Sequence, residues 1–242
     1  MKVEGREFAI YQVGTGGTGS QLLNNLCRFI SIMRARGIKI SLTLIDGDRF
    51  EQKNFANQNI SKNDIGKNKA EALATRYSAI YDFTINYVDR YIYSADELIE
   101  ILMNTLSYSV TPIIIGAVDN NATRKVINEV FEDLHTCIYL DSGNGTDNME
   151  GQCVIGYRCN KKELLAPIAK LYPEVLEDND LVENVVGCDV ISEGESPQHI
   201  ATNTLAANIL FGNLCSILER REIVNYLIKF NALTQQVKAY IA

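Results

Sequence analysis

The chain has 242 residues, of which 46% are hydrophobic and 22% are charged, and it contains only 4 prolines. This composition supports a buried core and excludes a disordered protein. The formal net charge of −7 gives no general attraction to phosphate backbones or anionic lipid, so we expect no nucleic acid and no membrane surface as a partner.

No apolar run approaches the length of about 18 residues that spans a bilayer, and the start MKVEGREF lacks the apolar stretch of a secretory signal. We therefore expect a cytoplasmic protein. The 6 cysteines lie far apart in a chain that is long enough to fold without cross-links, so reduced thiols are expected rather than a disulfide framework.

The first part of the chain alternates apolar runs with stretches of helical period, which is typical of βαβ units and a mostly parallel sheet. A strand over 8–13 enters the loop GTGGTGS, and apolar residues then recur at helical spacing as far as Gly37. Later strands are predicted, in chain order, at 39–46, 83–89, 112–119 and 137–141. Helices are predicted between them, at 67–80, 94–105 and 121–134.

The pattern changes after Asp141, because the next strand, over 152–159, follows without an intervening helix. This indicates an added antiparallel piece. A polar, acidic connection over 177–195 then leads to Ser196-Pro197, which predicts the start of a helix over 197–221. The tail at 233–241 could add a final edge strand.

We therefore expect a single α/β domain with a Rossmann-like, mostly parallel sheet, helices on both faces and an antiparallel C-terminal extension. Its nucleotide-binding core would cover 1–145. The extension, with a crossover loop, a helix and an edge strand, would cover 146–242.

The first chemical signal is the glycine loop, which matches GxGxxG and lies between a strand and a helix, as that motif requires. Its glycines are Gly14, Gly16, Gly17 and Gly19. Glycines permit a tight turn and close backbone approach, and the helix N-terminus offers amide donors to phosphate. The sequence therefore predicts a nucleotide site, with a merely tight turn as the alternative.

Asp46 ends the second predicted strand, where an acidic residue accepts hydrogen bonds from ribose hydroxyls in dinucleotide-binding folds. On the sequence alone, Asp46 could equally cap the following turn.

Four short patterns follow the glycine loop in order: D-x-D, N-x-x-N-Q, G-x-x-K-A and D-N-x-x-x-R. Their defined positions are Asp46, Asp48, Asn54, Gln58, Gly66, Lys69, Ala70, Asp119, Asn120 and Arg124. Together they resemble the ThiF/MoeB family of adenylyltransferases, relatives of the ubiquitin-activating enzymes, over residues 8–130. The later segment S-P-Q-x-I-A-x-N, at 196–203, is similar to the PRTRC-system ThiF proteins within that family.

The resemblance implies an enzyme that activates the C-terminal glycine of a small ubiquitin-like protein. A carboxylate oxygen attacks the α-phosphate of ATP, pyrophosphate leaves and an acyl-adenylate remains. Positive charge and Mg²⁺ are needed to bring an anion to a polyanion. The resemblance also implies a homodimer.

By the same resemblance, Lys69 would neutralise the triphosphate and Asp119 would hold Mg²⁺. Asn54 and Gln58 would contact phosphates, and Asp46 would contact the ribose. Asp48 and Asn120 complete the expected nucleotide contacts.

Two features depart from the family pattern. Asn57 stands where the family usually has arginine, so the fixed fork of donors that arginine aims at phosphate is missing. Only about 7 residues precede the first strand, where many relatives carry a helical segment. These departures support a second reading, in which the protein is a weakened or non-catalytic scaffold. An NAD- or FAD-linked oxidoreductase ranks last, because it leaves the K-A and D-N patterns unexplained.

Cysteine chemistry distinguishes members of this family. The chain has no C-x-x-C pair, so no zinc site of that kind is expected. Cys188 lies in the long polar connection, where relatives place an acceptor cysteine. We weigh a thioester or persulfide role for Cys188 against an inert loop cysteine.

Overall fold

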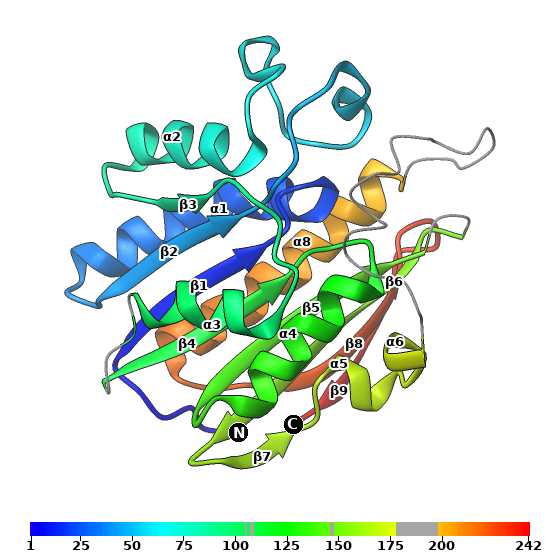
Figure 1. Cartoon of the computed structure of the whole chain (residues 1–242). Helices are drawn as coiled ribbons and strands as arrows, with labels where there is room; N and C mark the ends of the chain where they lie inside the picture. The colour runs from blue at the N-terminus through cyan, green and yellow to red at the C-terminus, as the bar shows by residue number, and fades with distance from the viewer. Residues whose placement is uncertain (105, 107–108, 146–147, 178–197) are drawn as a thin grey trace.

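The computed structural model describes residues 1–104, 106, 109–145, 148–177 and 198–242. Figure 1 shows a central twisted sheet with helices on both of its faces. This three-layer arrangement confirms the predicted fold class, a Rossmann-like α/β sheet with an antiparallel extension.

The strands, in chain order, are β1 Glu7–Val13, β2 Ile40–Ile45, β3 Asn86–Val88, β4 Val110–Gly116, β5 Cys137–Asn144, β6 Glu150–Cys159, β7 Lys162–Leu165, β8 Asn225–Asn231 and β9 Gln236–Ile241. The α-helices are α1 Gly17–Ala35, α2 Lys69–Tyr81, α3 Ala95–Met103, α4 Asn121–Asp133, α5 Ile168–Leu171, α6 Glu174–Glu177 and α8 Ile200–Cys215. Two 3-10 turns, η1 Gln52–Ala56 and η2 Lys62–Asp64, precede α2, and η3 Ser216–Arg220 extends α8.

The sheet order is β3-β2-β1-β4-β5-β6-β8-β9, and β7 also pairs with β6. Pairing from β3 to β5 is parallel, and from β5 onward it is antiparallel. The chain passes through β2 and β3 on one side of β1 and then crosses to β4 on the other, so the carboxyl ends of β1 and β4 flank a topological switch point. Ligands of open α/β sheets bind at such a point.

The two faces of the sheet bury different helices, because side chains alternate along each strand. Phe8 and Ile10 of β1 pack on one side with α1, α2 and α8. Ala9 and Tyr11 pack on the other side, with α3, α4, α5 and α6. Each fully buried Leu or Ile side chain contributes about 2 kcal/mol, so these two layers hold the strand ends in register.

Polar caps define where the helices that flank the site begin. Asn68, Ser94 and Asn120 each accept a hydrogen bond from the backbone N–H three residues later, at the starts of α2, α3 and α4. Such a cap contributes about 1 kcal/mol. The predicted cap at Ser196-Pro197 lies outside the described residues, and α8 begins at Ile200 with His199 as its cap.

The segment Ile200–Arg220 is long and apolar enough, by length and composition, to cross a membrane. The expectation that no stretch approaches that length is therefore wrong. Ala206, Leu210 and Leu214 of this segment are fully buried against the sheet and α1, so it packs as a core helix.

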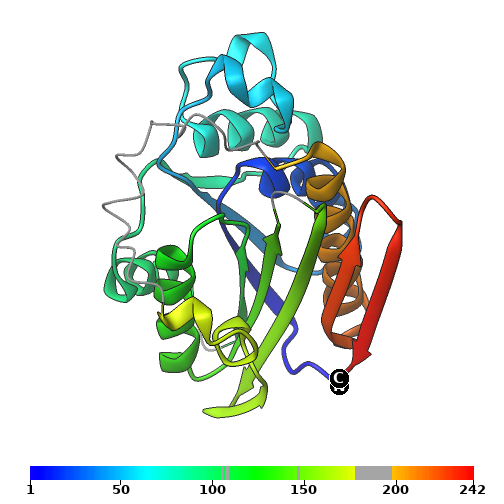
Figure 2. The same ribbon diagram turned by 90° about the vertical axis from the view of Figure 1, so that its right-hand side faces the viewer.

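Most predicted elements are confirmed, but β7, α5 and α6 were not predicted, and two strands differ more clearly. The predicted strand over 83–89 is shorter, because β3 is an edge strand that pairs only with the last half of β2. The strand β8 was not predicted, although it connects the predicted tail strand, β9, to the sheet. Figure 2 shows the β8–β9 hairpin standing beside α8, with the two termini together at one end.

Candidate nucleotide site

The glycine loop joins β1 to α1 at the switch point. Gly14 has φ +91°, and a Cβ there would lie 2.5 Å from the carbonyl oxygen of Ala117. A Cβ at Gly19 would overlap the carbonyl oxygen of Gly14. Only glycine satisfies both positions, so the loop turns tightly against the end of β4 and exposes backbone at the start of α1.

Asp46 fastens this loop to the end of β2. Its Oδ2 accepts from the backbone N–H of Thr15 at 2.7 Å and from the Thr15 hydroxyl at 2.8 Å. Its Oδ1 accepts from the backbone N–H of Asp48 at 2.9 Å, so Asp46 does cap the following turn. A carboxylate oxygen can accept two hydrogen bonds, which leaves Oδ1 able to accept one from a ribose hydroxyl.

Asp48 and Lys69 form an ion pair beside that turn. The Lys69 Nζ lies 2.9 Å from Asp48 Oδ2, and Lys69 is 6% exposed. Asn68, the cap of α2, donates to the carbonyl oxygens of Asp46 and Asp48 at 2.8 and 3.1 Å. Asp48 of the D-x-D pattern and Lys69 of the K-A pattern, 21 residues apart, are thus joined by their side chains.

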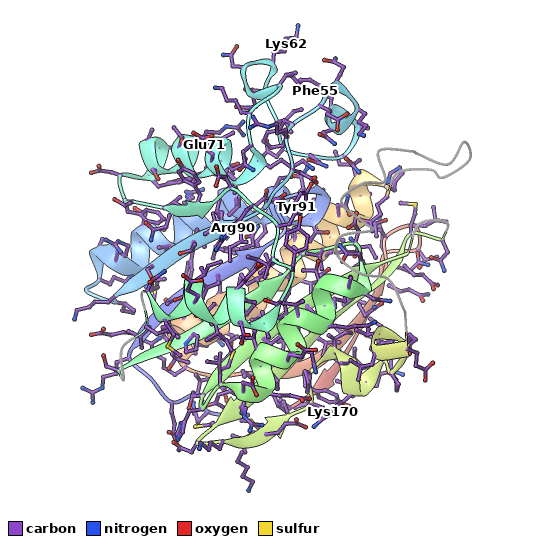
Figure 3. The ribbon with its side chains drawn as sticks, viewed as in Figure 1. Phe55, Lys62, Glu71, Arg90, Tyr91 and Lys170 are labelled. Carbon is purple, nitrogen blue, oxygen red and sulfur yellow. The ribbon has the colours of Figure 1, made fainter. Side chains whose placement is uncertain are left out.

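Tyr91, which follows β3, also belongs to this group, although none of the sequence patterns contains it. Its hydroxyl donates to Asp48 Oδ1. A Cβ on Gly47 would overlap the Tyr91 ring, so the glycine inside the D-x-D pattern admits the ring. Figure 3 shows Tyr91 below the projecting segment that carries Phe55 and Lys62.

The electrostatics of the two aspartates differ. Burial raises the pKa of Asp46, and the nearby Lys69 only partly opposes this. Burial also acts to raise the pKa of Asp48, but the Lys69 charge and the Tyr91 hydrogen bond outweigh it, so the pKa of Asp48 is lowered. Asp48 therefore stays ionised beside Lys69.

The projecting segment carries the N-x-x-N-Q pattern. Asn54 Oδ1 accepts from the backbone N–H of Glu51 at 2.8 Å, so its side chain caps the turn η1. Gln58 lies over the glycine loop, with its Nε2 3.8 Å from the Cβ position of Gly16. Within the described residues, the buried Gln58 Oε1 has no hydrogen-bond partner.

Asn57 bonds to the C-terminal half of the chain. Its Nδ2 donates to the carbonyl oxygen of Gln198 at 3.3 Å, and Gln198 Nε2 donates to the carbonyl oxygen of Asn144 at 3.4 Å. The position where the family has arginine thus connects the projecting segment to the start of α8.

A buried amide cluster joins α8 to the glycine loop. Asn144 Nδ2 lies 2.9 Å from both Thr18 Oγ1 and Asn203 Oδ1. A Cβ on Gly17 would overlap the Asn203 amide, so Gly17 is required by packing. Asn203 is the last residue of the S-P-Q-x-I-A-x-N segment, which could have indicated this contact.

Asp119 follows β4 and is exposed, next to the part of the chain that packs on Gly14. Asn120, expected to contact nucleotide, accepts from the backbone N–H of Thr123 at 2.8 Å as the cap of α4. Arg124 holds this loop, because its Nη2 donates to the carbonyl oxygen of Val118 at 2.7 Å.

Arg124 is itself held by a buried carboxylate. Its Nε lies 3.2 Å from Asp141 Oδ1, and the Tyr139 hydroxyl donates to Asp141 Oδ2 at 2.7 Å. Burial raises the pKa of Asp141, although Arg124 opposes the shift. The R of the D-N-x-x-x-R pattern is therefore a support for the Asp119 loop.

The described residues contain no group of three or more His, Cys, Asp or Glu side chains that could hold a metal ion. Mg²⁺ bound with a nucleotide needs only one or two carboxylates, because phosphate oxygens and water supply its other ligands. The exposed carboxylate of Asp119 beside the glycine loop fits that need.

Cys188 lies outside the described residues. Cys27, Cys137, Cys153 and Cys159 are buried, Cys215 is partly buried, and all five are free thiols. Burial raises the pKa of Cys153 to about 12 and that of Cys215 to about 11. The Cys153 and Cys215 thiols are therefore protonated at neutral pH and unsuited to nucleophilic attack.

The ThiF family profile matches residues 6–240. Among solved structures, PaaA has 16% identity and a TM-score of 0.64, covering 98% of this chain and 64% of that chain. E. coli MccB with ATP also has 16% identity, with a TM-score of 0.61 and the same coverage, 98% and 64%.

A third structure, the microcin C7 biosynthetic enzyme MccB in complex with N-formylated MccA, has 16% identity and a TM-score of 0.60. It covers 96% of this chain and 64% of that chain. This chain therefore spans less than two thirds of these structures' chains, and at such identities they establish its fold. No curated protein matches the sequence.

Proposed function

Because the chain belongs to the ThiF family, we propose that it is an ATP-dependent adenylyltransferase. Its substrate is the C-terminal glycine carboxylate of a small ubiquitin-like protein, and it acts as a cytoplasmic homodimer. A shorter peptide is the alternative substrate, in view of the complex between MccB and N-formylated MccA.

The observation that carries the proposal is the buried Lys69, next to the D-x-D turn that fastens the glycine loop. Lys69 is 6% exposed, and Asp48 supplies the ionic partner that a buried cation needs, at 2.9 Å. A preorganised cation stabilises the negative charge that develops on a triphosphate as the bond to pyrophosphate breaks.

In the proposed reaction, the glycine loop and the N-terminus of α1 bind phosphate oxygens, and Asp46 accepts a hydrogen bond from the ribose. A substrate carboxylate oxygen forms a bond to the α-phosphorus, and the bond to the pyrophosphate oxygen breaks. Lys69 stabilises the departing charge. Asp119 would hold Mg²⁺, which would supply further neutralisation of the phosphates.

A scaffold that binds nucleotide or partner without chemistry is the second candidate. Asn57 favours it, because the side chain at the family's arginine position donates to the Gln198 carbonyl oxygen and supplies no guanidinium.

Exchange between ATP and radiolabelled pyrophosphate, measured with Mg²⁺ and candidate glycine-terminated proteins, separates these candidates. We expect exchange that depends on the partner protein. Its rate should be about 100-fold lower in Lys69→Ala, because removing one preorganised charged group slows a reaction by about that factor. The matched control is Lys67→Ala, which removes an exposed lysine two residues earlier. ATP binding without exchange in the wild type would instead support the scaffold, and stabilisation by NAD rather than ATP would support the oxidoreductase.

A further inference from the structure

Tyr91 contacts the Asp48 carboxylate from outside the four sequence patterns. It comes from the segment between β3 and α3, and its hydroxyl donates to the Asp48 oxygen that Lys69 does not use. The two oxygens of Asp48 are thus bound by two different donors. We propose that Tyr91 is a positioning residue: it anchors Asp48, and Asp48 in turn holds Lys69 where it can bind the ATP phosphates. This inference rests on the proposed function.

The geometry requires such an anchor. The Asp48 side chain is 48% exposed, whereas that of Lys69 is 8% exposed. An exposed carboxylate rotates freely unless a second contact holds it, and a lysine side chain carries about 2 kcal/mol of rotamer entropy. With the Tyr91 hydrogen bond in place, Asp48 presents one fixed oxygen to the ammonium group, so the charge of Lys69 has a defined position.

The charge balance leads to the same result. Asp48 is an anion next to the place proposed for a polyanion, so it opposes phosphate binding. A hydroxyl donor draws charge density from the carboxylate and leaves Lys69 less fully neutralised. Loss of the Tyr91 hydroxyl therefore both loosens Lys69 and strengthens the repulsion.

The ring of Tyr91 has a separate, structural role. It packs on Gly47, where a Cβ would overlap it, and its centroid is 6.3 Å from that of Tyr93. Tyr91→Phe keeps this packing and removes only the hydroxyl. Tyr93→Phe is the matched control, because Tyr93 is 42% exposed and lies beside Tyr91 on the same segment.

The first test measures the affinity of the purified protein for ATP and for AMP by calorimetry. We expect Tyr91→Phe to weaken ATP binding by about tenfold, the effect of one hydrogen bond to a charged group. AMP binding should change less than twofold, because AMP lacks the β- and γ-phosphates, and Tyr93→Phe should match the wild type. Equal losses for ATP and AMP would overturn the proposal, since they would indicate general damage to the site.

The second test asks whether Tyr91 acts through Asp48. In the Asp48→Asn background, Tyr91→Phe should have no further effect on ATP affinity, and the two changes should be non-additive. Full additivity would overturn the proposal. If the wild type binds ATP but shows no pyrophosphate exchange, the proposed adenylyltransferase function is contradicted and the role of Tyr91 is not. If Tyr91→Phe binds ATP as tightly as the wild type, only the proposed role of Tyr91 is contradicted.

Discussion

Two buried cations lie near the carboxyl ends of the strands, and each is paired with a carboxylate that also accepts a tyrosine hydroxyl. In the Arg124–Asp141 pair the side chains are 11% and 1% exposed. In the Lys69–Asp48 pair they are 8% and 48% exposed. In both cases a cation, a carboxylate and a tyrosine form a cluster. The Arg124–Asp141–Tyr139 cluster is closed to solvent, and the Lys69–Asp48–Tyr91 cluster is open to it.

In the closed cluster, the N–H groups of Arg124 donate hydrogen bonds to other groups of the protein. Arg124 binds Asp141, the carbonyl oxygens of Val118 and Ser142, and the side chain of Asn121. It fixes the loop that presents Asp119. The open cluster keeps an ionised carboxylate and an ammonium group at the edge of the glycine loop. The Lys69 pair can therefore meet a ligand because its carboxylate is exposed, whereas the Arg124 pair is enclosed by protein.

Replacing each cation in turn should change the stability of the protein by very different amounts. Arg124→Leu should lower the free energy of unfolding by about 3–5 kcal/mol, because it leaves Asp141 buried without its partner. Lys69→Leu should cost about 1 kcal/mol or less, because water can solvate the half-exposed Asp48. Urea denaturation measures both values. Equal losses would show that the Lys69 pair is as closed as the other.

A smaller effect concerns pH, because the two carboxylates shift in opposite directions. The lowered pKa of Asp48 means that its contribution to stability is present above the unfolded pKa of about 3.9 and is lost as pH falls through the folded value. The raised pKa of Asp141 means that its contribution is present below the unfolded value and is lost as pH rises through the folded one.

Denaturation of the wild type, Asp48→Asn and Asp141→Asn between pH 3 and 7 tests this contrast. On acidification, the free energy of unfolding of the wild type should fall relative to that of Asp48→Asn. Relative to that of Asp141→Asn, it should rise. Parallel pH dependences for the two variants would contradict the opposite shifts.

Adding a cation near the Lys69–Asp48 pair should have a more modest effect. Asn57→Arg restores the family's arginine beside Gln58, which lies over the glycine loop. We expect an increase of about threefold to tenfold in ATP affinity, because a guanidinium offers a fork of donors to phosphate. Asn57→Gln is the neutral control. A decrease specific to Asn57→Arg would mean that the bond to the Gln198 carbonyl oxygen matters more than the missing charge.

The sequence predicted the elements of the parallel half well, because each depends on local signals. The glycine loop, Asp46 and Lys69 lie in short patterns, and their meeting follows from the rule that carboxyl ends of parallel strands share an edge. Tyr91 could not be found in this way, because the segment after β3 has no periodicity and its partner is 43 residues earlier in the chain.

Non-local pairing explains the other omissions. The place of β8 in the sheet depends on antiparallel pairing with β6, which lies far earlier in the chain, whereas its other partner, β9, follows it in a hairpin. Asp141 was expected to end its strand, but β5 continues to Asn144, so its carboxylate is buried inside the sheet. The contact between Asn203 and Gly17 likewise depends on how α8 packs against the glycine loop, although the S-P-Q-x-I-A-x-N segment marks Asn203 as a candidate.

The two chain ends have a practical consequence for protein engineering. The amino group of Met1 donates to the carbonyl oxygen of Ile223 at 2.7 Å, and the backbone N–H of Ala242 donates to that of Val224 at 2.9 Å. Both ends therefore lie against the same turn, away from the glycine loop (Figures 1 and 2). A short linker could join them, so a circular permutant opened at an exposed loop would keep every strand of the sheet and leave the candidate site intact.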